Sequence, residues 1–139
     1  MDKMILKFNA KSENEAFART CVSAFILPLN PSLEELSDVK TAVSEAVTNA
    51  VVHAYDRGED GVIEIECEIS GAELHIKIKD FGKGIENIDE ALEPFFTTRS
   101  FEERSGMGFT IMKTFMSDLS VETVPSGGTV VSMKKRFAG

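Results

Sequence analysis

Residues 63–79 alternate between apolar and charged side chains with the period of two that is typical of a β-strand. In 63–69 the odd positions are isoleucine or cysteine and the even positions are glutamate; in 74–79 the even positions are leucine or isoleucine and the odd positions are histidine or lysine. The small residues at 70–72 predict a hairpin turn. A sheet with one apolar face needs cover on that face only, so the sequence predicts an α+β two-layer sandwich, with helices on one face of a mixed, mostly antiparallel sheet.

Asp80 continues this alternation on the apolar face, where a carboxylate needs polar partners. Gly82 and Gly84 follow it, and they allow the backbone to turn sharply and a ligand to come close. Asp80 is therefore expected to face a ligand rather than solvent. The cross-strand pairs expected on the opposite, charged face are Glu64 with Lys79 and Glu66 with Lys77.

Two capping-box sequences predict helices for the covering layer. The first, Ser12 to Glu15, is expected to begin a helix that runs to about Leu27. The second, Ser32 to Glu35, is expected to begin a long helix that ends before Gly58. The residues expected on the inward stripe of the first helix are Phe17, Cys21, Ala24 and Phe25.

Further strands are expected over 4–8, 119–123 and 129–133, and a helix is expected to follow the glycines at 106 and 108. A glycine-led helix N-terminus offers free N–H groups to an anion. The basic run Lys134-Lys135-Arg136 is expected to be a solvated strand end. Periodicity fades between 87 and 105, and a loop of this length in a compact domain is typical of a lid or a binding segment.

The second half of the long helix carries a polar stripe formed by Glu45, Asn49 and His53, which recur every four residues. Glu45 is the only formal charge between Thr41 and Tyr55, so both faces of this helix are expected to be covered. The sheet is expected to cover one face. Whatever covers the other face is expected to interact with the carboxylate of Glu45 and the carboxamide of Asn49. Mg-nucleotide is the hypothesis for that second cover, with a structural role for His53 left open.

With 139 residues the chain is expected to form a single domain, 1–139. Its net charge of −8 argues against general affinity for nucleic acid or for anionic membranes, and a basic protein partner fits better. The start lacks the apolar core of a signal peptide and no apolar run could span a bilayer, so a cytoplasmic protein is expected. Cys21 and Cys67 have no metal-ligand spacing and are expected to fill the core.

Four short features occur in an order that is more specific than any one of them: Glu45 to His53 on a helix, Asp80-x-Gly82-x-Gly84 after a strand, Gly106-x-Gly108 before a helix, and Gly127-Gly128-Thr129 in a turn. They resemble the N, G1, G2 and G3 boxes of the ATPase superfamily that includes gyrase B, Hsp90, histidine kinases and MutL. That resemblance implies the Bergerat ATP-binding fold. No P-loop sequence is present.

Within that superfamily the chain resembles the anti-sigma factor F family of spore-forming bacteria, which are protein serine kinases. The segments that carry this likeness are Ser44 to Ala50, Phe96 to Thr98 and, above all, Glu103 to Met112. Ala54, where the family often has glycine, and Phe81, where a small or charged residue is commoner, depart from the pattern. Phe81 is the departure that bears on the fit around a nucleotide.

The resemblance implies a role for each site residue. Asn49 would bind Mg²⁺ beside the phosphates, and Glu45 would accept the proton of the attacking serine hydroxyl. Asp80 would receive the adenine amino group, Arg104 would sit against the γ-phosphate, and the segment of about 94–105 would be the ATP lid. The other residues expected to contact ATP or ADP are His53, Gly82, Gly84, Ile85, Thr97, Thr98, Ser105, Gly106, Met107, Gly108, Phe109 and Thr129.

The resemblance also implies a partner switch. A homodimer would bind a sigma factor of the sigma F type, and an anti-anti-sigma protein would displace sigma until the kinase phosphorylates one of its serines. Helix residues near Arg19 are a candidate sigma-facing surface. Two other functions stay open: a nucleotide-gated sigma-binding module without useful phosphotransfer, and a histidine-kinase-like ATPase. A serine kinase of the stress-response branch is a closer variant.

Overall fold

The computed structural model describes residues 2–54, 61–82, 108–125 and 127–138. These residues form five strands, three α-helices, a 3₁₀ turn at Leu27–Leu29 and a π-helical segment at Ala50–Ala54. The elements are β1 (Asp2–Asn9), α1 (Asn14–Phe25), α2 (Leu33–Asn49), β2 (Val62–Ser70), β3 (Glu73–Asp80), α4 (Gly108–Phe115), β4 (Asp118–Thr123) and β5 (Thr129–Arg136). No helix in these ranges is long and apolar enough to cross a bilayer.

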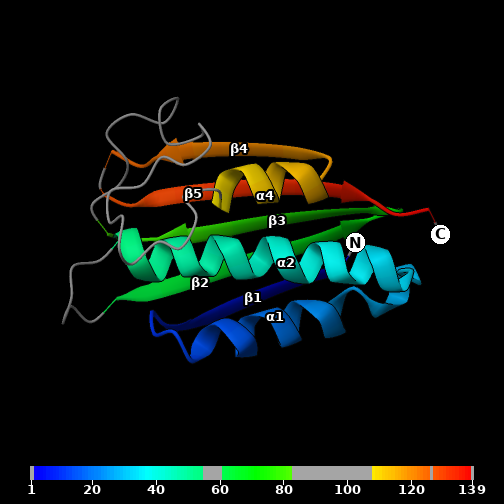
Figure 1. Cartoon of the computed structure of the whole chain (residues 1–139), viewed down its shortest axis with the longest axis horizontal. Coiled ribbons are helices and arrows are strands. Elements are labelled where there is room, and N and C mark those ends of the chain that lie inside the picture. Colours follow the sequence, from blue (N-terminus) through cyan, green and yellow to red (C-terminus); the bar gives the residue numbers. More distant parts are fainter. Residues whose placement is uncertain (1, 55–60, 83–107, 126, 139) are drawn as a thin grey trace.

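The strands form one sheet in the order β1-β2-β3-β5-β4, and all three α-helices lie on the same face of it (Figure 1). The predicted two-layer α+β sandwich is confirmed, and every pairing between the described strands is antiparallel. The hairpin register is also confirmed, because Glu64 lies opposite Lys79 and Glu66 opposite Lys77. The period of two therefore located both faces of the sheet.

The core lies between the inner face of the sheet and α2, the central helix of the covering layer (Figure 1). Helices α1 and α4 flank α2 and pack against it on either side. Alternate residues of β2 and β3 are almost completely buried, and each buried isoleucine contributes roughly 1.5–3 kcal/mol to folding. The largest fully buried side chains are Val22, Ile26, Val39, Val43, Val47, Ile63, Ile65, Cys67, Leu74, Ile76, Met112 and Met133.

The outer face of the sheet carries rows of opposite charge on β1, β2 and β3. Lys3 and Lys79 both lie near Glu66, at 3.2 and 3.4 Å, and Lys7 and Lys79 both lie near Glu64, at 3.5 and 3.4 Å. Such solvated pairs contribute little individually, on the order of 0–1 kcal/mol each. Their effect is to give this side of the sheet a polar surface that water can cover.

The N-terminus of α1 differs from its prediction. The expected capping box at Ser12 does not form: Glu13 occupies the N-cap position with helical dihedral angles and makes no side-chain capping bond. Instead Asn14 Nδ2 donates to the carbonyl of Asn9 across the turn that leaves β1, at 2.8 Å. This contact fixes the entry into the helix.

The inward stripe of α1 was predicted wrongly in part: Phe25 packs against the core, but Phe17 and Ala24 are exposed. Ala18, Val22 and Ile26, at the end of the helix, are buried, whereas Phe17 is 49% exposed. The buried residues recur every four positions, so the buried stripe of α1 lies one position further along the chain than most of the predicted one. Of the two cysteines expected in the core, Cys67 is buried and Cys21 is half-buried. Burial raises the pKa of the Cys67 thiol to about 12, so it stays protonated at neutral pH.

The second capping box is confirmed at the start of α2. Ser32 Oγ accepts from the Glu35 N–H at 3.0 Å, and Glu35 Oε1 accepts from the Ser32 N–H at 2.9 Å. Glu35 Oε2 also accepts from the N–H of Ala138, at 3.0 Å. The residues after β5 are thereby attached to the first turn of the long helix.

Lys135 corrects the expectation of a solvated strand end. Its side chain is only 13% exposed, and it lies on the inner face of β5 with Thr129, Val131 and Met133. Nζ donates to the carbonyl of Phe115 at 2.8 Å and lies 3.4 Å from Asp38 Oδ2. The neighbouring Lys134 is exposed, as predicted.

Candidate functional site

A buried carboxylate marks one end of the sheet, where β3 ends and β5 begins. Asp80 and Thr129 are paired across the two strands and are 8% and 4% exposed. Asp80 Oδ1 accepts from the Thr129 N–H at 3.2 Å and from the Gly82 N–H at 3.1 Å. Asp80 is buried on the same face of β3 as Ile76 and Ile78, so the prediction that it points inward, towards the helical layer, is confirmed.

The environment of Asp80 perturbs its protonation. Burial raises the pKa of the carboxyl group above its ordinary value, and the two backbone N–H groups of Gly82 and Thr129 oppose that rise. A buried carboxylate whose pKa is raised by desolvation gains from a ligand that brings a hydrogen-bond donor to it. The amino group of a purine is a donor of this kind.

The turn between β4 and β5 fits closely against the main chain of Asp80 and Phe81. Gly128 has a φ of +103°, and a Cβ atom there would lie 2.1 Å from the carbonyl oxygen of Asp80 and 2.9 Å from Cα of Phe81. Only glycine allows both the dihedral angle and the approach. The glycines at 127 and 128 were predicted only as turn residues, so the contact made by Gly128 is a feature that the sequence did not indicate.

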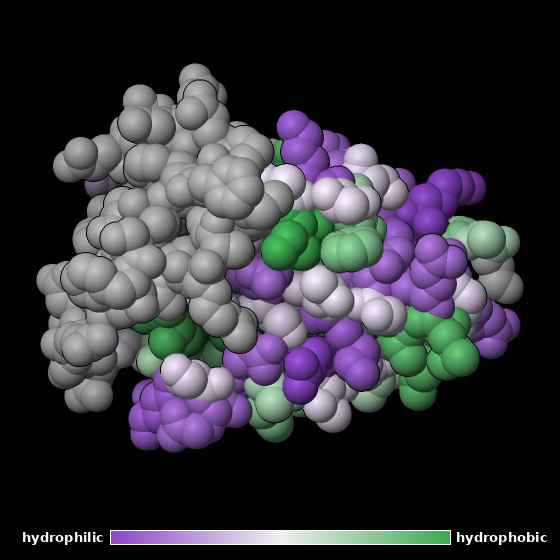
Figure 2. Space-filling view, viewed as in Figure 1, coloured by the Kyte–Doolittle hydropathy of each residue, from purple (hydrophilic) through white to green (hydrophobic). Residues whose placement is uncertain are grey.

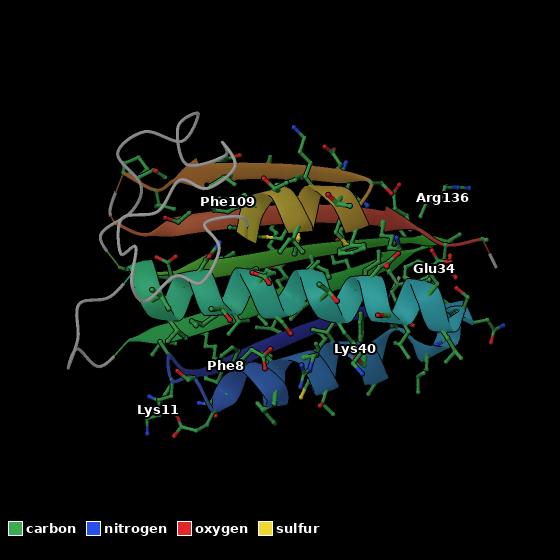
Figure 3. The ribbon with its side chains drawn as sticks, in the orientation of Figure 1. Phe8, Lys11, Glu34, Lys40, Phe109 and Arg136 are labelled. Carbon is green, nitrogen blue, oxygen red and sulfur yellow. The ribbon has the colours of Figure 1, made fainter. Side chains whose placement is uncertain are left out.

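The polar stripe on α2 lies beside the start of α4. A Cβ atom on Gly108 would lie 2.8 and 2.9 Å from the two terminal atoms of the Asn49 side chain, so the first residue of α4 contacts this carboxamide directly. Phe109 follows at the N-terminal end of α4 (Figure 3). Asn49 and Gly108, which were both expected at the phosphate end of a nucleotide, therefore lie side by side.

The helix changes form directly after Asn49. Residues 50–54 are π-helical, so His53 does not continue a regular α-helical stripe from Glu45 and Asn49, as the spacing had predicted. A π-helical turn widens the helix and frequently accompanies a functional site. The part that the His53 side chain plays stays a prediction.

A shallow groove of about 390 Å³ runs between α1 and α2. Glu15 and Arg19 of α1, which form an ion pair at 3.5 Å, line one side, and Lys40 and Ser44 of α2 line the other (Figure 3 labels Lys40). Glu45 belongs to the same lining. The surface around these helices is largely hydrophilic, with separate hydrophobic patches (Figure 2). The groove therefore gives a partner access to Glu45 from the α1 side.

Several predicted site residues lie outside the described ranges. They are Gly84, Ile85, Thr97, Thr98, Arg104, Ser105, Gly106 and Met107, together with the expected lid over about 94–105. Five of the predicted residues that the structure describes fall into two groups, Asp80 with Gly82 and Thr129 at the sheet, and Asn49 with Gly108 between two helices. Glu45 lines the groove between α1 and α2 instead. Both groups lie at the end of the molecule where α2 and β3 end (Figure 1).

Comparison with known proteins identifies the family. A model of the histidine kinase-like ATPase domain matches residues 8–135. Curated proteins named anti-sigma F factor match nearly the whole chain: one from Clostridium botulinum (strain Eklund 17B / Type B) is 58% identical over 98% of this chain and 95% of its own length. The chain belongs to the anti-sigma F factor family. Another member, from Thermoanaerobacter sp. (strain X514), is 54% identical over 95% of this chain and 92% of its own.

Solved structures support the fold of this anti-sigma F factor family member. The structure of the RsbU and RsbW domains of Rv1364c from Mycobacterium tuberculosis covers 99% of the chain with a TM-score of 0.71 at 16% identity, and the match spans 32% of that longer protein. The catalytic domain of histidine kinase ThkA matches 99% of the chain and 97% of its own length with a TM-score of 0.62 at 18% identity. At these identities the likeness concerns the fold alone.

The Asp80→Asn variant tests the carboxylate that this family member buries. Asn keeps the shape of the side chain and the acceptor Oδ1 but removes the charge. In the parent protein, burial raises the pKa of the Asp80 carboxyl group. The folded state therefore binds the Asp80 proton more tightly than the unfolded state, and this favourable contribution is lost as pH rises from the unfolded pKa through the folded one. We expect the variant without ligand to be as stable as the parent, or more stable, at about pH 7, with the difference disappearing towards about pH 4.

Urea unfolding over that pH range measures the effect, with the exposed Glu122→Gln on β4 as a control. Stability of the parent that increases relative to Asp80→Asn as pH rises would contradict this assignment. The same samples report the stabilisation by ADP, which we expect Asp80→Asn to abolish and Glu122→Gln to preserve.

Gly128→Ala tests the close turn. A methyl group there meets the Asp80 carbonyl, so we expect a loss of roughly 3 kcal/mol or more in the free energy of unfolding. Gly71→Ala is the matched control, because Gly71 also has a positive φ, +61°, but no atom within 4 Å of its added Cβ. It should cost only about 1–2 kcal/mol. Equal losses for the two variants, measured by denaturant unfolding, would show that Gly128 is required for its dihedral angle alone.

Proposed function

We propose that this protein is an anti-sigma factor and a protein serine kinase. It binds a sigma factor of the sigma F type and uses Mg-ATP to phosphorylate a serine of an anti-anti-sigma protein. The relatives named anti-sigma F factor support the first part, and the histidine kinase-like ATPase domain supports nucleotide binding. The observation that carries the proposal is the buried carboxylate of Asp80, held by two backbone N–H groups at the same end of the molecule as Asn49 and Gly108.

Asp80 and Thr129 form the adenine end of the proposed site. The carboxylate is oriented by the backbone of Gly82 and Thr129, and its burial favours a neutral donor such as the adenine amino group. Gly128 lets the turn before β5 pack directly against the main chain of Asp80 and Phe81. ATP and ADP share this end of the ligand, so both are expected to bind.

Asn49 and the N-terminus of α4 form the phosphate end. Asn49 supplies a neutral oxygen, which suits an ion whose other ligands are phosphate oxygens and water. Within the described ranges no three acidic, histidine or cysteine side chains come close enough to hold a metal ion by themselves, which fits a magnesium ion that binds together with the nucleotide. Gly108 and Phe109 begin a helix whose N–H groups and dipole favour an anion.

Glu45 is the proposed general base. It lies one turn before Asn49 on α2 and lines the groove between α1 and α2, so a serine hydroxyl that enters along this groove meets the carboxylate. Mg-ATP, when bound, would supply the phosphoryl group, and its Mg²⁺ would offset the negative charge of the phosphates. Arg104, in the proposed lid of about 94–105, is assigned to the γ-phosphate. For His53 two roles stay open, contact with the nucleotide and support of the helix end.

The partners follow from the same assignment. The sigma factor and the anti-anti-sigma protein compete for this protein, and Arg19, on the α1 side of the groove, is a candidate contact for sigma. A homodimer of the 1–139 domain is the proposed active form, in the cytoplasm. The net charge of −8 disfavours direct binding to nucleic acid.

Glu45→Gln tests the kinase. The protein is incubated with γ-labelled Mg-ATP and an anti-anti-sigma protein, and acid-stable label on the acceptor is measured. We expect Glu45→Gln to lower transfer by about 10²–10⁴-fold while the dissociation constants for ATP and for sigma stay within about twofold. Glu34→Gln, an exposed change in the first turn of the same helix (Figure 3), is the control and should leave all three unchanged.

The other outcomes of that experiment are informative. Binding of ATP and sigma without transfer by the parent would favour a nucleotide-gated binding module. Acid-labile label would favour transfer to histidine. Loss of ATP binding in Glu45→Gln would make Glu45 a structural residue.

Asn49→Ala tests the metal assignment. We expect it to weaken Mg-ATP binding roughly ten- to a hundredfold, because one contact to a charged group is lost, and to change binding of ATP in excess EDTA much less. Isothermal titration with and without Mg²⁺ measures both values on one protein. An equal loss in the two conditions would mean that Asn49 does not act through the metal.

A further inference from the structure

Lys135 of β5 contacts both α2 and α4, at residues 97 and 20 positions away in the sequence. Nζ donates to the carbonyl of Phe115, the last residue of α4, at 2.8 Å, and lies 3.4 Å from Asp38 of α2. The lysine and aspartate side chains are 13% and 19% exposed, so this ion pair is largely withdrawn from water. It lies outside the candidate site.

The same two helices meet again at the site. Asp38 and Asn49 are eleven residues apart on α2, which places them three turns apart on one side of the helix, about 16 Å along its axis. Helix α4 has eight residues, a length of about 12 Å, and runs antiparallel to α2 beside it (Figure 1). Its first residue, Gly108, contacts Asn49, and its last is bonded to Lys135.

A helix of two turns has little stability of its own, so its position depends on its contacts. Met112 and Met116, just beyond its end, anchor it to the core, but apolar contacts are not directional. The bond from Lys135 is directional, and a lysine at a helix C-terminus also interacts favourably with the helix dipole. Lys135 therefore limits sliding and rotation of α4 along α2.

We propose that Lys135 is a positioning residue for phosphate binding, which acts through α4. By tying the C-terminus of α4 to Asp38, it holds the N-H groups at the other end of the helix in register with Asn49. The inference rests on the proposed binding of ADP and ATP. It assigns to the basic run at the end of β5 a role in ligand affinity, at a residue that does not touch the ligand.

The test compares ADP with adenosine, which shares the adenine end but lacks the phosphates. We expect Lys135→Met to raise the dissociation constant for ADP about three- to tenfold and to leave that for adenosine within about twofold. Lys134→Met is the matched control, since Lys134 is the adjacent lysine of β5 and is exposed on the other face; it should change neither value. Lys135→Arg should restore most of the ADP affinity.

Removing one partner of a covered ion pair is itself destabilising, so the double variant Lys135→Met with Asp38→Asn is measured as well. It leaves no unpaired charge but also no tie between the helices, and we expect the same selective loss of ADP affinity. The amide signals of Gly108 and Phe109 in nitrogen–proton NMR spectra should shift in both Lys135→Met variants without ligand, and not in Lys134→Met.

Unchanged ADP affinity in the double variant, or equal losses for ADP and adenosine, would overturn the inference and leave the pair a structural one. Absence of ADP binding by the parent protein would instead contradict the proposed function on which the inference rests. The two failures are therefore distinguishable in one set of titrations.

Discussion

The core and both ends of this structure depend on the pleat of the sheet, because every second side chain of each strand points towards the helices. Most residues on that inner face are apolar and bury the core under α2. Two charged side chains on the same face are largely covered as well, Asp80 at one end and Lys135 at the other. Lys135 lies six positions after Thr129, the partner of Asp80, which is about 20 Å along the strand. One end holds the buried carboxylate, and the lysine at the other end bonds to the C-terminus of α4, whose first residue contacts Asn49.

Secondary structure could be predicted where local chemistry decides it and not where a distant contact does. The capping sequences at Ser32 and at Ser12 look alike, yet only Ser32 forms the reciprocal bonds with its glutamate. At the other position Asn14 bonds to Asn9 across the turn from β1, a contact that no pattern within the helix reveals. The π-helical form of 50–54 was likewise missed, because its residues have no composition that distinguishes them from the preceding α-helix.

The site could be predicted in part. The alternation of apolar and charged residues alone predicted that Asp80 points inward. The same alternation on β5 places Lys135 on the inner face, but the two charged residues beside it led to the prediction of a solvated strand end. The approach of Gly108 to Asn49 spans 59 residues of sequence and was expected only through resemblance to a family, which the full-length relatives then established. The contact of Gly128 with Asp80 depends on how two strand ends meet, which is a tertiary property.

The oxygen that Asp80 uses to accept from Thr129 is bonded across 49 residues of sequence. The strand that supplies this partner is the last to be synthesised of the five described, and it inserts between β3 and β4 rather than at an edge. On the ribosome, the first three-fifths of the chain can form the β1-β2-β3 sheet and still lack the partner that orients the carboxylate. A nascent chain that has not yet produced β5 therefore has an incomplete sheet and an Asp80 carboxylate without its Thr129 partner, and β5 completes both together when it leaves the exit tunnel.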